Sequence, residues 1–318
     1  MRISSVLLAA AVSAAPTKSV AGTGGDSPIT AGLLPKKGFA TFTNRLHPNN
    51  RIGYRFHEHT PIVHGRVPTS DQQAGIDPAQ VAGRQRDFSG RSGAVKYTLP
   101  VRGKGWVDQH WTFYLAPVAD GIDLLLVVEA GKTGLNDYYG IQQCFRMSGK
   151  TNQQWRRAIA ETPAFSEYDR WNSTQENDAG KTSLTCVLRG GAWAALPATP
   201  EAVGARTPIG LRFDTDRTRG RIETMPKVGP YDAHMLDPID CGLIARTNRE
   251  KTWVCGIFWE RTSHVTDHHP ADCLHAIVNI GGIPPGSKRA VRGKIYWFKG
   301  TLDNLRNRWQ RDFISKDP

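Results

Sequence analysis

The sequence predicts an all-β protein, an antiparallel β-sandwich, jelly roll or super-sandwich with about two short helices. About a dozen short segments are rich in β-branched, aromatic or alternating apolar residues, which is typical of strands. The 318 residues include 32 Gly and 20 Pro, which indicates many turns between short strands. The order of segments lacks the strand–helix–strand alternation of Rossmann and TIM-barrel folds, so we exclude those classes.

The first residues predict an export signal. Arg2 supplies a positive charge, residues 6–12 form a short apolar run, and residues 13–15 are small. The apolar run is far shorter than the roughly 20 residues needed to cross a bilayer. We therefore expect a signal peptide at 1–15, a secreted or periplasmic location and no membrane span. Residues 16–38 have a linker-like composition, so a flexible linker is expected there and a single β-sandwich domain over 39–318.

The domain begins with an alternating stretch, and strand patterns follow it along the chain. Residues 68–92 interrupt them with a polar stretch that predicts a long surface excursion. Apolar runs such as 122–129 are expected at the centre of a sheet. The predicted strands are 39–43, 52–56, 94–99, 111–115, 122–129, 138–145, 184–188, 209–213, 242–245, 253–259, 274–280 and 293–298.

Two segments predict helices. Residues 151–161 place Trp155, Ala158 and Ile159 on one face, and Thr151 is a suitable N-cap. The chain ends with a second amphipathic segment from residue 302 to 313, in which apolar residues recur at helical spacing.

The charge balance favours an anionic partner. Lys and Arg number 41 and Asp and Glu number 29, so the formal net charge is +12. Polyanionic glycans and anionic envelope surfaces suit a basic exported protein, whereas export argues against nucleic acid. The alternative is that the charge serves only solubility.

The sequence does not decide whether the five cysteines form disulfides. An odd number leaves at least one thiol unpaired, and no CxxC spacing indicates a zinc knuckle. Cys241 and Cys255 could face each other across a hairpin, or the thiols could be buried as small apolar groups. The cysteines are Cys144, Cys186, Cys241, Cys255 and Cys273.

The densest metal-ligand pattern is His57, His59 and His64. On a strand His57 and His59 would share a face, and His64 could return from the turn after Pro61 as a third ligand of a divalent metal. The pattern resembles half of the metal site of cupins, a jelly-roll family, although the Glu that cupins carry downstream is not at its usual spacing. The alternative is a set of surface histidines that bind a polar ligand.

A second histidine-rich segment covers residues 263–275 and is expected to be mostly loop. Asp267, His268 and His275 could meet the first cluster across the sandwich, or the segment could be a polar loop with a few hydrogen-bonded histidines.

Aromatic residues beside polar ones suggest a sugar ligand, because indole rings stack on sugars while hydroxyl groups hydrogen-bond. Such clusters surround Glu167 and Trp171, and also Trp106 and Trp111. The predicted catalytic residues are His57, His59, Tyr139, Arg146, Glu167 and His268. The predicted substrate-binding residues are Trp106, Trp111, Tyr138, Gln143 and Trp171.

The chain end carries a family resemblance. The turn-forming run at 281–289 and the following strand to Phe298 resemble the close of galactose-mutarotase-like β-sandwich domains. These domains recur in secreted glycan-active bacterial proteins, including polysaccharide lyases. The resemblance covers about the last third of the chain and implies a super-sandwich and a sugar ligand. The catalytic His and Glu motifs of mutarotases have no counterpart that can be placed here.

We therefore expect an exported protein that degrades a polysaccharide, with a lyase acting on an acidic glycan favoured over a hydrolase. The alternative is a non-catalytic glycan-binding or envelope protein. No Gly-x-Ser-x-Gly elbow or phosphate loop occurs in the sequence, so neither a serine nucleophile of that type nor a nucleotide cofactor is expected.

Overall fold

The computed structural model describes most of the predicted domain. The described residues are 21–23, 27–34, 39–47, 51–56, 62–63, 75–99, 109–132, 134–135, 139–146, 174–177, 180–197, 202–207, 238–248, 250–268 and 273–315.

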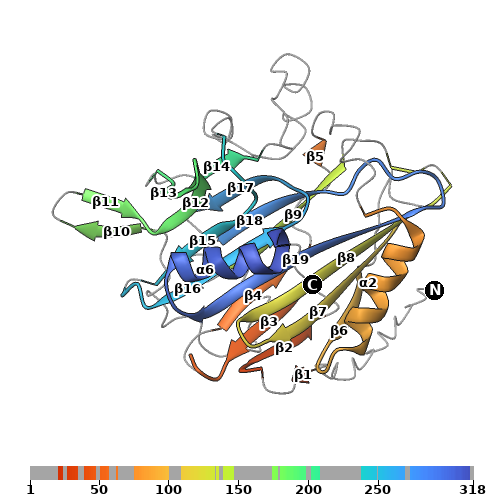
Figure 1. The fold of residues 1–318 in the computed structure, drawn as a ribbon, viewed down its shortest axis with the longest axis horizontal. Helices are drawn as coiled ribbons and strands as arrows, with labels where there is room; N and C mark the ends of the chain where they lie inside the picture. Colours follow the sequence, from red (N-terminus) through yellow and green to blue (C-terminus); the bar gives the residue numbers. More distant parts are fainter. Residues whose placement is uncertain are drawn as a thin grey trace, which may run out of the picture.

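Two large antiparallel sheets pack face to face, which confirms the predicted all-β sandwich (Figure 1). The nine-stranded sheet has the order β1-β2-β3-β4-β9-β18-β17-β14, with β5 beside β9. Its strands are β1 (Ala21–Thr23), β2 (Ile29–Leu34), β3 (Phe39–Asn44), β4 (Arg51–Arg55), β5 (Ile62–Val63), β9 (Tyr139–Arg146), β14 (Ala202–Arg206), β17 (Thr262–His268) and β18 (Cys273–Asn279).

The second sheet has eight strands in the order β13-β12-β15-β16-β19-β8-β7-β6. A separate hairpin joins β10 (Thr174–Asn177) to β11 (Gly180–Ser183). The strands of the eight-stranded sheet are β6 (Val95–Leu99), β7 (Gln109–Val118), β8 (Gly121–Ala130), β12 (Thr185–Arg189), β13 (Ala192–Ala195), β15 (Ile244–Thr247), β16 (Trp253–Trp259) and β19 (Lys288–Lys299).

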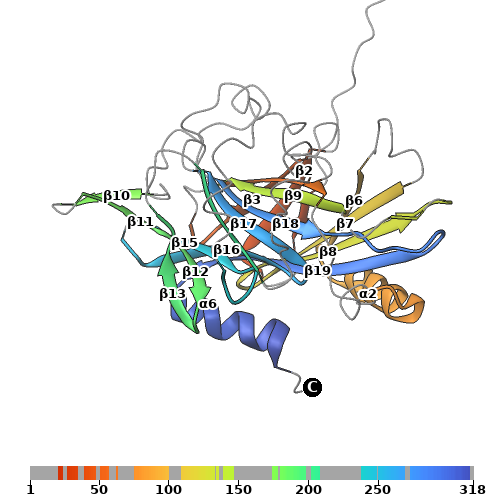
Figure 2. The same ribbon diagram turned by 90° about the horizontal axis from the view of Figure 1, so that it is seen from above.

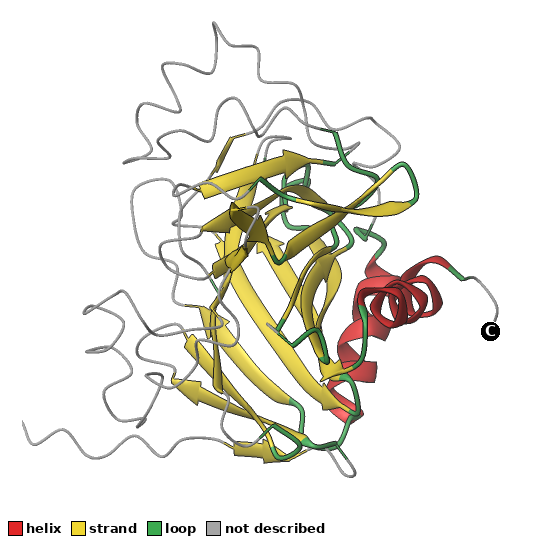
Figure 3. Ribbon diagram, turned by 90° about the vertical axis from the view of Figure 1, so that its left-hand side faces the viewer, coloured by secondary structure: helices red, strands yellow, loops and turns green. Residues whose placement is uncertain are grey.

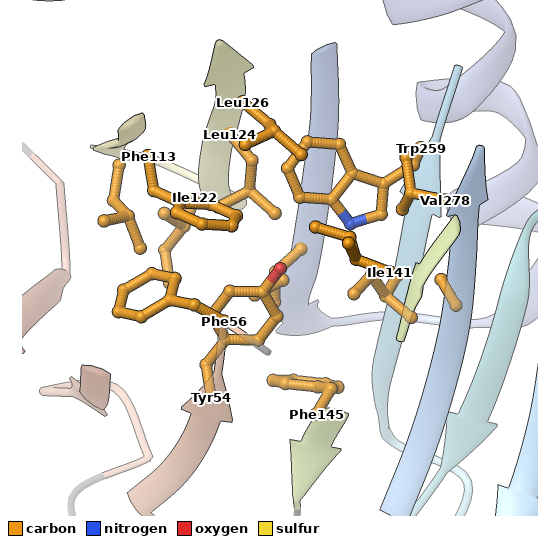
Figure 4. Packing of buried hydrophobic residues seen from close by; sticks show 14 of the residues in the cluster. Tyr54, Phe56, Phe113, Ile122, Leu124, Leu126, Ile141, Phe145, Trp259 and Val278 are labelled. Atoms are coloured by element: carbon orange, nitrogen blue, oxygen red, sulfur yellow. The ribbon is translucent and has the colours of Figure 1, made fainter. Parts of the chain in front are cut away.

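The main core lies between the inner faces of the two sheets. Alternation along each strand sends every second side chain inward, so Ile141 and Phe145 of β9 belong to the same core cluster as Trp259 of β16 (Figure 4). Tyr54 also points into this core, and its hydroxyl donates a hydrogen bond to Oε1 of Gln143. Burial raises the pKa of Tyr54 well above its ordinary value, so the hydroxyl stays protonated as a donor.

The two α-helices within the described residues, α2 and α6, cover the outer face of the eight-stranded sheet (Figures 2 and 3). Helix α6 (Leu302–Trp309) begins with a capping box at Thr301 and buries Leu305 and Trp309 against β16 and β19. A short π-helical turn (Gln310–Ile314) continues it, so the predicted C-terminal helix is confirmed. Helix α2 (Pro78–Gly90) packs on β7, β8 and β19.

Some segments differ from the sequence-based expectation. Part of the expected linker forms β1 and β2, and β2 sends Ile29, Ala31 and Leu33 into the core. Helix α2 lies inside the expected surface excursion at 68–92, where Asp77 caps it and Pro78 begins it. The first half of the histidine-rich segment is strand β17 rather than loop. The expected helix at 151–161 and strand at 209–213 lie outside the described residues.

None of the five cysteines forms a disulfide, so Cys241 and Cys255 are not bonded across a hairpin. Across the described ranges, no helix combines the length and the apolar character that a membrane crossing needs.

Candidate functional site

Polar residues of β9, β18 and β17 lie on the outer face of the nine-stranded sheet. This face is turned away from the eight-stranded sheet. On β9 the inward residues Ile141 and Phe145 leave the even-numbered positions to face outward. The register pairs Phe145 with Leu274 of β18, and both are core residues. The outward positions of the three strands therefore form adjacent rows.

Two of these rows hold the candidate site. In one row, Arg146 of β9 pairs with Cys273 of β18, which in turn pairs with His268 of β17. In the next row, Cys144, His275 and Thr266 occupy the corresponding positions. Directly opposed residues in antiparallel strands have Cβ atoms about 4.5–5.5 Å apart, so the side chains of each row are in reach of one another.

Three side chains with metal-binding atoms come close together between these two rows. The Sγ atoms of Cys144 and Cys273 and a ring nitrogen of His275 lie within 4.8 Å of one another. All three side chains are buried, with exposed fractions of 0%, 0% and 2%. Thiolate and imidazole are the donors that zinc prefers in proteins, so this trio is the candidate metal-ligand cluster.

Hydrogen bonds orient two of the three donors. The Nε of Arg146 donates to Sγ of Cys273 over 3.0 Å. Oγ1 of Thr266 lies 2.9 Å from Nδ1 of His275. A guanidinium beside a thiol favours the thiolate, and a hydrogen bond at one ring nitrogen fixes the orientation of an imidazole. The cluster therefore has a preset geometry.

The nearby His264 extends the polar character along β17. It pairs with Ile277 of β18 and is fully buried, and its Nδ1 lies 3.1 Å from the hydroxyl of Ser263. Arg55 of β4 pairs with Cys144 from the other side. The outer face therefore carries cationic or imidazole groups on both sides of the thiols.

The carboxylate of β17 points the other way. Asp267 pairs with Leu274 and faces the core, where Oδ1 accepts a hydrogen bond from Nη2 of Arg246 over 2.7 Å. Both side chains are fully buried. This ion pair joins β17 to β15 through the sandwich, so Asp267 does not share a face with His275.

The expected metal ligands His57, His59 and His64 lie outside the described residues, as do Trp106, Tyr138, Glu167 and Trp171. The backbone of Tyr139 pairs with Val63 of β5, and that of His268 pairs with Cys273. Of the expected catalytic residues, Arg146 and His268 thus occupy the same row.

Two of the expected substrate-binding residues are in the inter-sheet core. Trp111 is fully buried there, and its Nε1 donates to Oε1 of Gln109 over 3.2 Å. Gln143 is fully buried beside Tyr54. Both side chains contribute to packing between the sheets and lie on the opposite side of the nine-stranded sheet from the metal-ligand cluster.

Sequence reasoning did not find that Cys144 and Cys273 lie close together. The two cysteines are 129 positions apart and belong to no local motif. A usable signal existed in Cys273 and His275, because the Cys-x-His spacing on one strand puts both side chains on one face. The strand order β9-β18 supplies the third donor, and one sequence does not reveal that order.

The comparisons with known proteins give low similarity. No family model and no curated protein matches the sequence. Solved structures with a related arrangement include the Slr1438 protein of Synechocystis sp. PCC 6803, with 9% identity and a TM-score of 0.43 over 91% of this chain and 99% of that one. They also include a galactose mutarotase-like protein of Clostridium acetobutylicum, with 8% identity and a TM-score of 0.38 over 86% of this chain and 94% of that one.

A third solved structure is that of a candidate aldose 1-epimerase of Escherichia coli K12. It shares 9% identity, and its TM-score is 0.30 over 65% of this chain and 66% of that one. All three TM-scores are low, so these likenesses assign no function to this chain.

Proposed function

We propose that the protein is exported and acts on an acidic polysaccharide, and that it binds this ligand at the outer face of the nine-stranded sheet. A lyase reaction is favoured over hydrolysis. The single observation that carries the proposal is the distribution of charge over five neighbouring strands, β4, β9, β18, β17 and β14.

The outward positions of these five strands are basic or neutral. The one carboxylate in the five strands, Asp267, faces the core and is paired with Arg246. A face with many cations and no carboxylate at its outward positions attracts anions. Among the residues whose side chains the structure describes, the basic ones at these positions are Arg55, Arg146, His264 and His275.

Arg146 is the best candidate for binding a uronate carboxylate. Its side chain is 4% exposed, and a desolvated cation attracts a carboxylate more strongly than an exposed one does. Neutralising that carboxylate makes the proton on the adjacent C5 more acidic. Arg146 would therefore stabilise the anion that forms when the C5 proton is removed.

His268 is the candidate base. It lies in the same row as Arg146, two strands away, which is about 9–10 Å between their backbones. In the proposed elimination its imidazole takes the C5 proton, the C4–oxygen bond breaks, and a C4–C5 double bond forms. The departing sugar oxygen takes a proton from an acid or from water.

The test is incubation with alginate, pectin, ulvan and glycosaminoglycans while the absorbance of new unsaturated chain ends is recorded. We expect a signal with at least one polymer, and we expect Arg146→Gln and His268→Gln to abolish it. Lys288→Gln is the matched control, because Lys288 pairs with Glu129 on the other sheet and both are well exposed. It should retain full activity.

A non-catalytic glycan-binding protein is the second candidate. The observation that favours it is that Arg146 is already held by its hydrogen bond to Cys273, as a fixed anchor would be. Glycan binding without any new chain ends would support this candidate and remove the lyase. New reducing ends without unsaturated products would indicate a hydrolase.

Export can be tested separately. The proposal expects the protein in the periplasmic or extracellular fraction, with an N-terminus near residue 16 after signal cleavage. Recovery of the uncleaved chain from the cytoplasm would contradict it.

A further inference from the structure

The arrangement of Cys144 and Cys273 is unsuited to a disulfide. Cys144 is directly opposite His275, and Cys273 is directly opposite Arg146, so the two cysteines are diagonal neighbours. Diagonal residues have Cβ atoms up to about 7–8 Å apart, whereas a disulfide needs about 3.5–4.5 Å. Their Sγ atoms nevertheless lie within 4.8 Å of each other. Two thiols at this separation can be bridged by an ion that binds sulfur at about 2.3 Å.

The third donor completes a ligand set with a known preference. We propose that Cys144, Cys273 and His275 bind one zinc ion through two thiolates and an imidazole. A set of two Cys and one His leaves a fourth tetrahedral position for water or a ligand oxygen. This site differs from the histidine cluster expected from the sequence, because it uses none of His57, His59 and His64.

The surroundings supply what such a site needs. Zinc binds thiolates, so the two thiols must release their protons to solvent as the metal binds. The Nε of Arg146 donates a hydrogen bond to Sγ of Cys273 over 3.0 Å, so a positive charge lies beside one of the two sulfur donors. Thr266 contacts Nδ1 of His275, as partners of metal-bound histidines do at the nitrogen that does not bind the metal.

The charge balance also fits the basic outer face. A zinc ion with two thiolates and a neutral imidazole has no net charge. The occupied site therefore adds no positive charge to a surface that already carries Arg55 and Arg146. Its burial keeps competing water away from the thiolates.

The zinc site does not rest on the proposed lyase activity, because metal content and affinity are measured without any glycan. Failure of the lyase assay would leave the zinc result untouched, and absence of zinc would leave Arg146 and His268 in their proposed roles.

The experiment measures zinc in the purified full-length protein after dialysis, and then replaces zinc by cobalt. We expect one zinc per chain, and in the cobalt form a thiolate-to-cobalt charge-transfer band together with the visible bands of a tetrahedral ion. Cys144→Ala, Cys273→Ala and His275→Gln should each lose stoichiometric zinc. Cys255→Ala is the matched control, since Cys255 is equally buried but lies in the inter-sheet core.

A second measurement guards against variants that fail to fold. Thr266→Val keeps all three donors and removes only the contact with His275, so it should bind zinc about 10–100-fold more weakly. A ligand that binds only the folded state stabilises it, so a chelator should lower the melting temperature of the wild type and added zinc should restore it. The three donor variants that fold should show no such response.

Two results would overturn the inference. The first is a folded wild type that binds neither zinc nor cobalt in stoichiometric amount and whose melting temperature is indifferent to chelator. The second is a Cys144–Cys273 disulfide detected by mass spectrometry of unreduced peptides from the folded protein.

Discussion

At the scale of single residues, Arg246 and Asp267 form a buried ion pair that links the two sheets. Both side chains are fully buried, and Arg246 also donates from Nε to the hydroxyl of Thr185 over 2.9 Å. Removing one charge leaves the other buried without its counterion. We expect Asp267→Asn to lower the free energy of unfolding by about 3–5 kcal/mol, measured by urea denaturation.

The control for this pair is removal of both charges. Replacing Arg246 by Met together with Asp267 by Leu leaves no buried charge, and apolar replacements of buried ion pairs are often neutral or stabilising. The double variant should therefore be more stable than Asp267→Asn. Equal urea midpoints for the wild type and Asp267→Asn would show that the pair has no role in stability.

Two thiols outside the metal-ligand cluster give a second prediction at this scale. Burial raises the pKa of Cys186 and of Cys241 from 9.0 to about 11. The thiolate is the nucleophile, so at pH 8 both should react with iodoacetamide roughly 100-fold more slowly than an unhindered cysteine peptide. Alkylation should accelerate up to about pH 11. Mass spectrometry of digested samples measures this, and rapid labelling at pH 8 would contradict it.

At the scale of elements, Asp120 connects the β7–β8 turn to β19 and α6. Its carboxylate accepts from Nζ of Lys294 and from Nη1 of Arg308, each over 2.9 Å. Burial opposes ionisation of Asp120, but the charges and hydrogen bonds of these two cations outweigh it and lower its pKa below the ordinary 3.8. The carboxylate therefore stabilises the fold above about pH 4, and this contribution is lost as the pH falls below 3.8.

The variant Asp120→Asn tests this connection. Hydrogen bonds to charged groups contribute about 1.5–3 kcal/mol, so we expect the free energy of unfolding at pH 7 to fall by that amount. The variant should also lose less stability than the wild type between pH 5 and pH 3. The control is Asp303→Asn, an exposed i,i+3 partner of Arg306 whose removal should change little. Parallel acid profiles for the wild type and Asp120→Asn would contradict the assignment.

The elements also show which strands and helices the sequence patterns could predict and which they could not. Strands with apolar inward residues, such as β8 and β16, were predicted because alternation or continuous apolarity marks them. Strand β17 was not, because its outward residues and the inward Asp267 are polar. That carboxylate is stabilised in the core by Arg246, which comes from another strand. Helix α2 was missed because just two apolar residues, Val81 and Phe88, are buried along it.

The candidate site was predictable only in part for the same reason. Arg146 and His275 drew attention through their residue types and their neighbours in the sequence. Arg146 and His275 lie close to Cys144 because β18 is placed between β9 and β17 in a fixed register. Long-range register is set by packing of the whole sheet, so a single sequence carries little direct trace of it.

At the scale of the whole molecule, the two outer faces of the sandwich differ in the side chains that they bury. The helices α2 and α6 cover the eight-stranded sheet with apolar side chains. The outer face of the nine-stranded sheet instead buries thiols, imidazoles and a guanidinium on its central strands. Partners within the chain offset the cost of burying these polar groups, as the contacts of Arg146 with Cys273 and of Thr266 with His275 show.

The extent of the folded domain gives the last prediction. The sequence placed its start at residue 39, but Ile29 and Leu33 of β2 are core residues, and the hydroxyl of Ser27 donates to the carbonyl of Val118 over 2.7 Å. Burying an Ile or a Leu side chain contributes about 1.5–3 kcal/mol. A chain that begins at residue 39 should therefore be several kcal/mol less stable than one that begins at residue 16, and its uncovered β3 edge should promote association. Urea denaturation and size-exclusion chromatography compare the two chains, and a shared urea midpoint with both chains monomeric would restore the linker interpretation of 16–38.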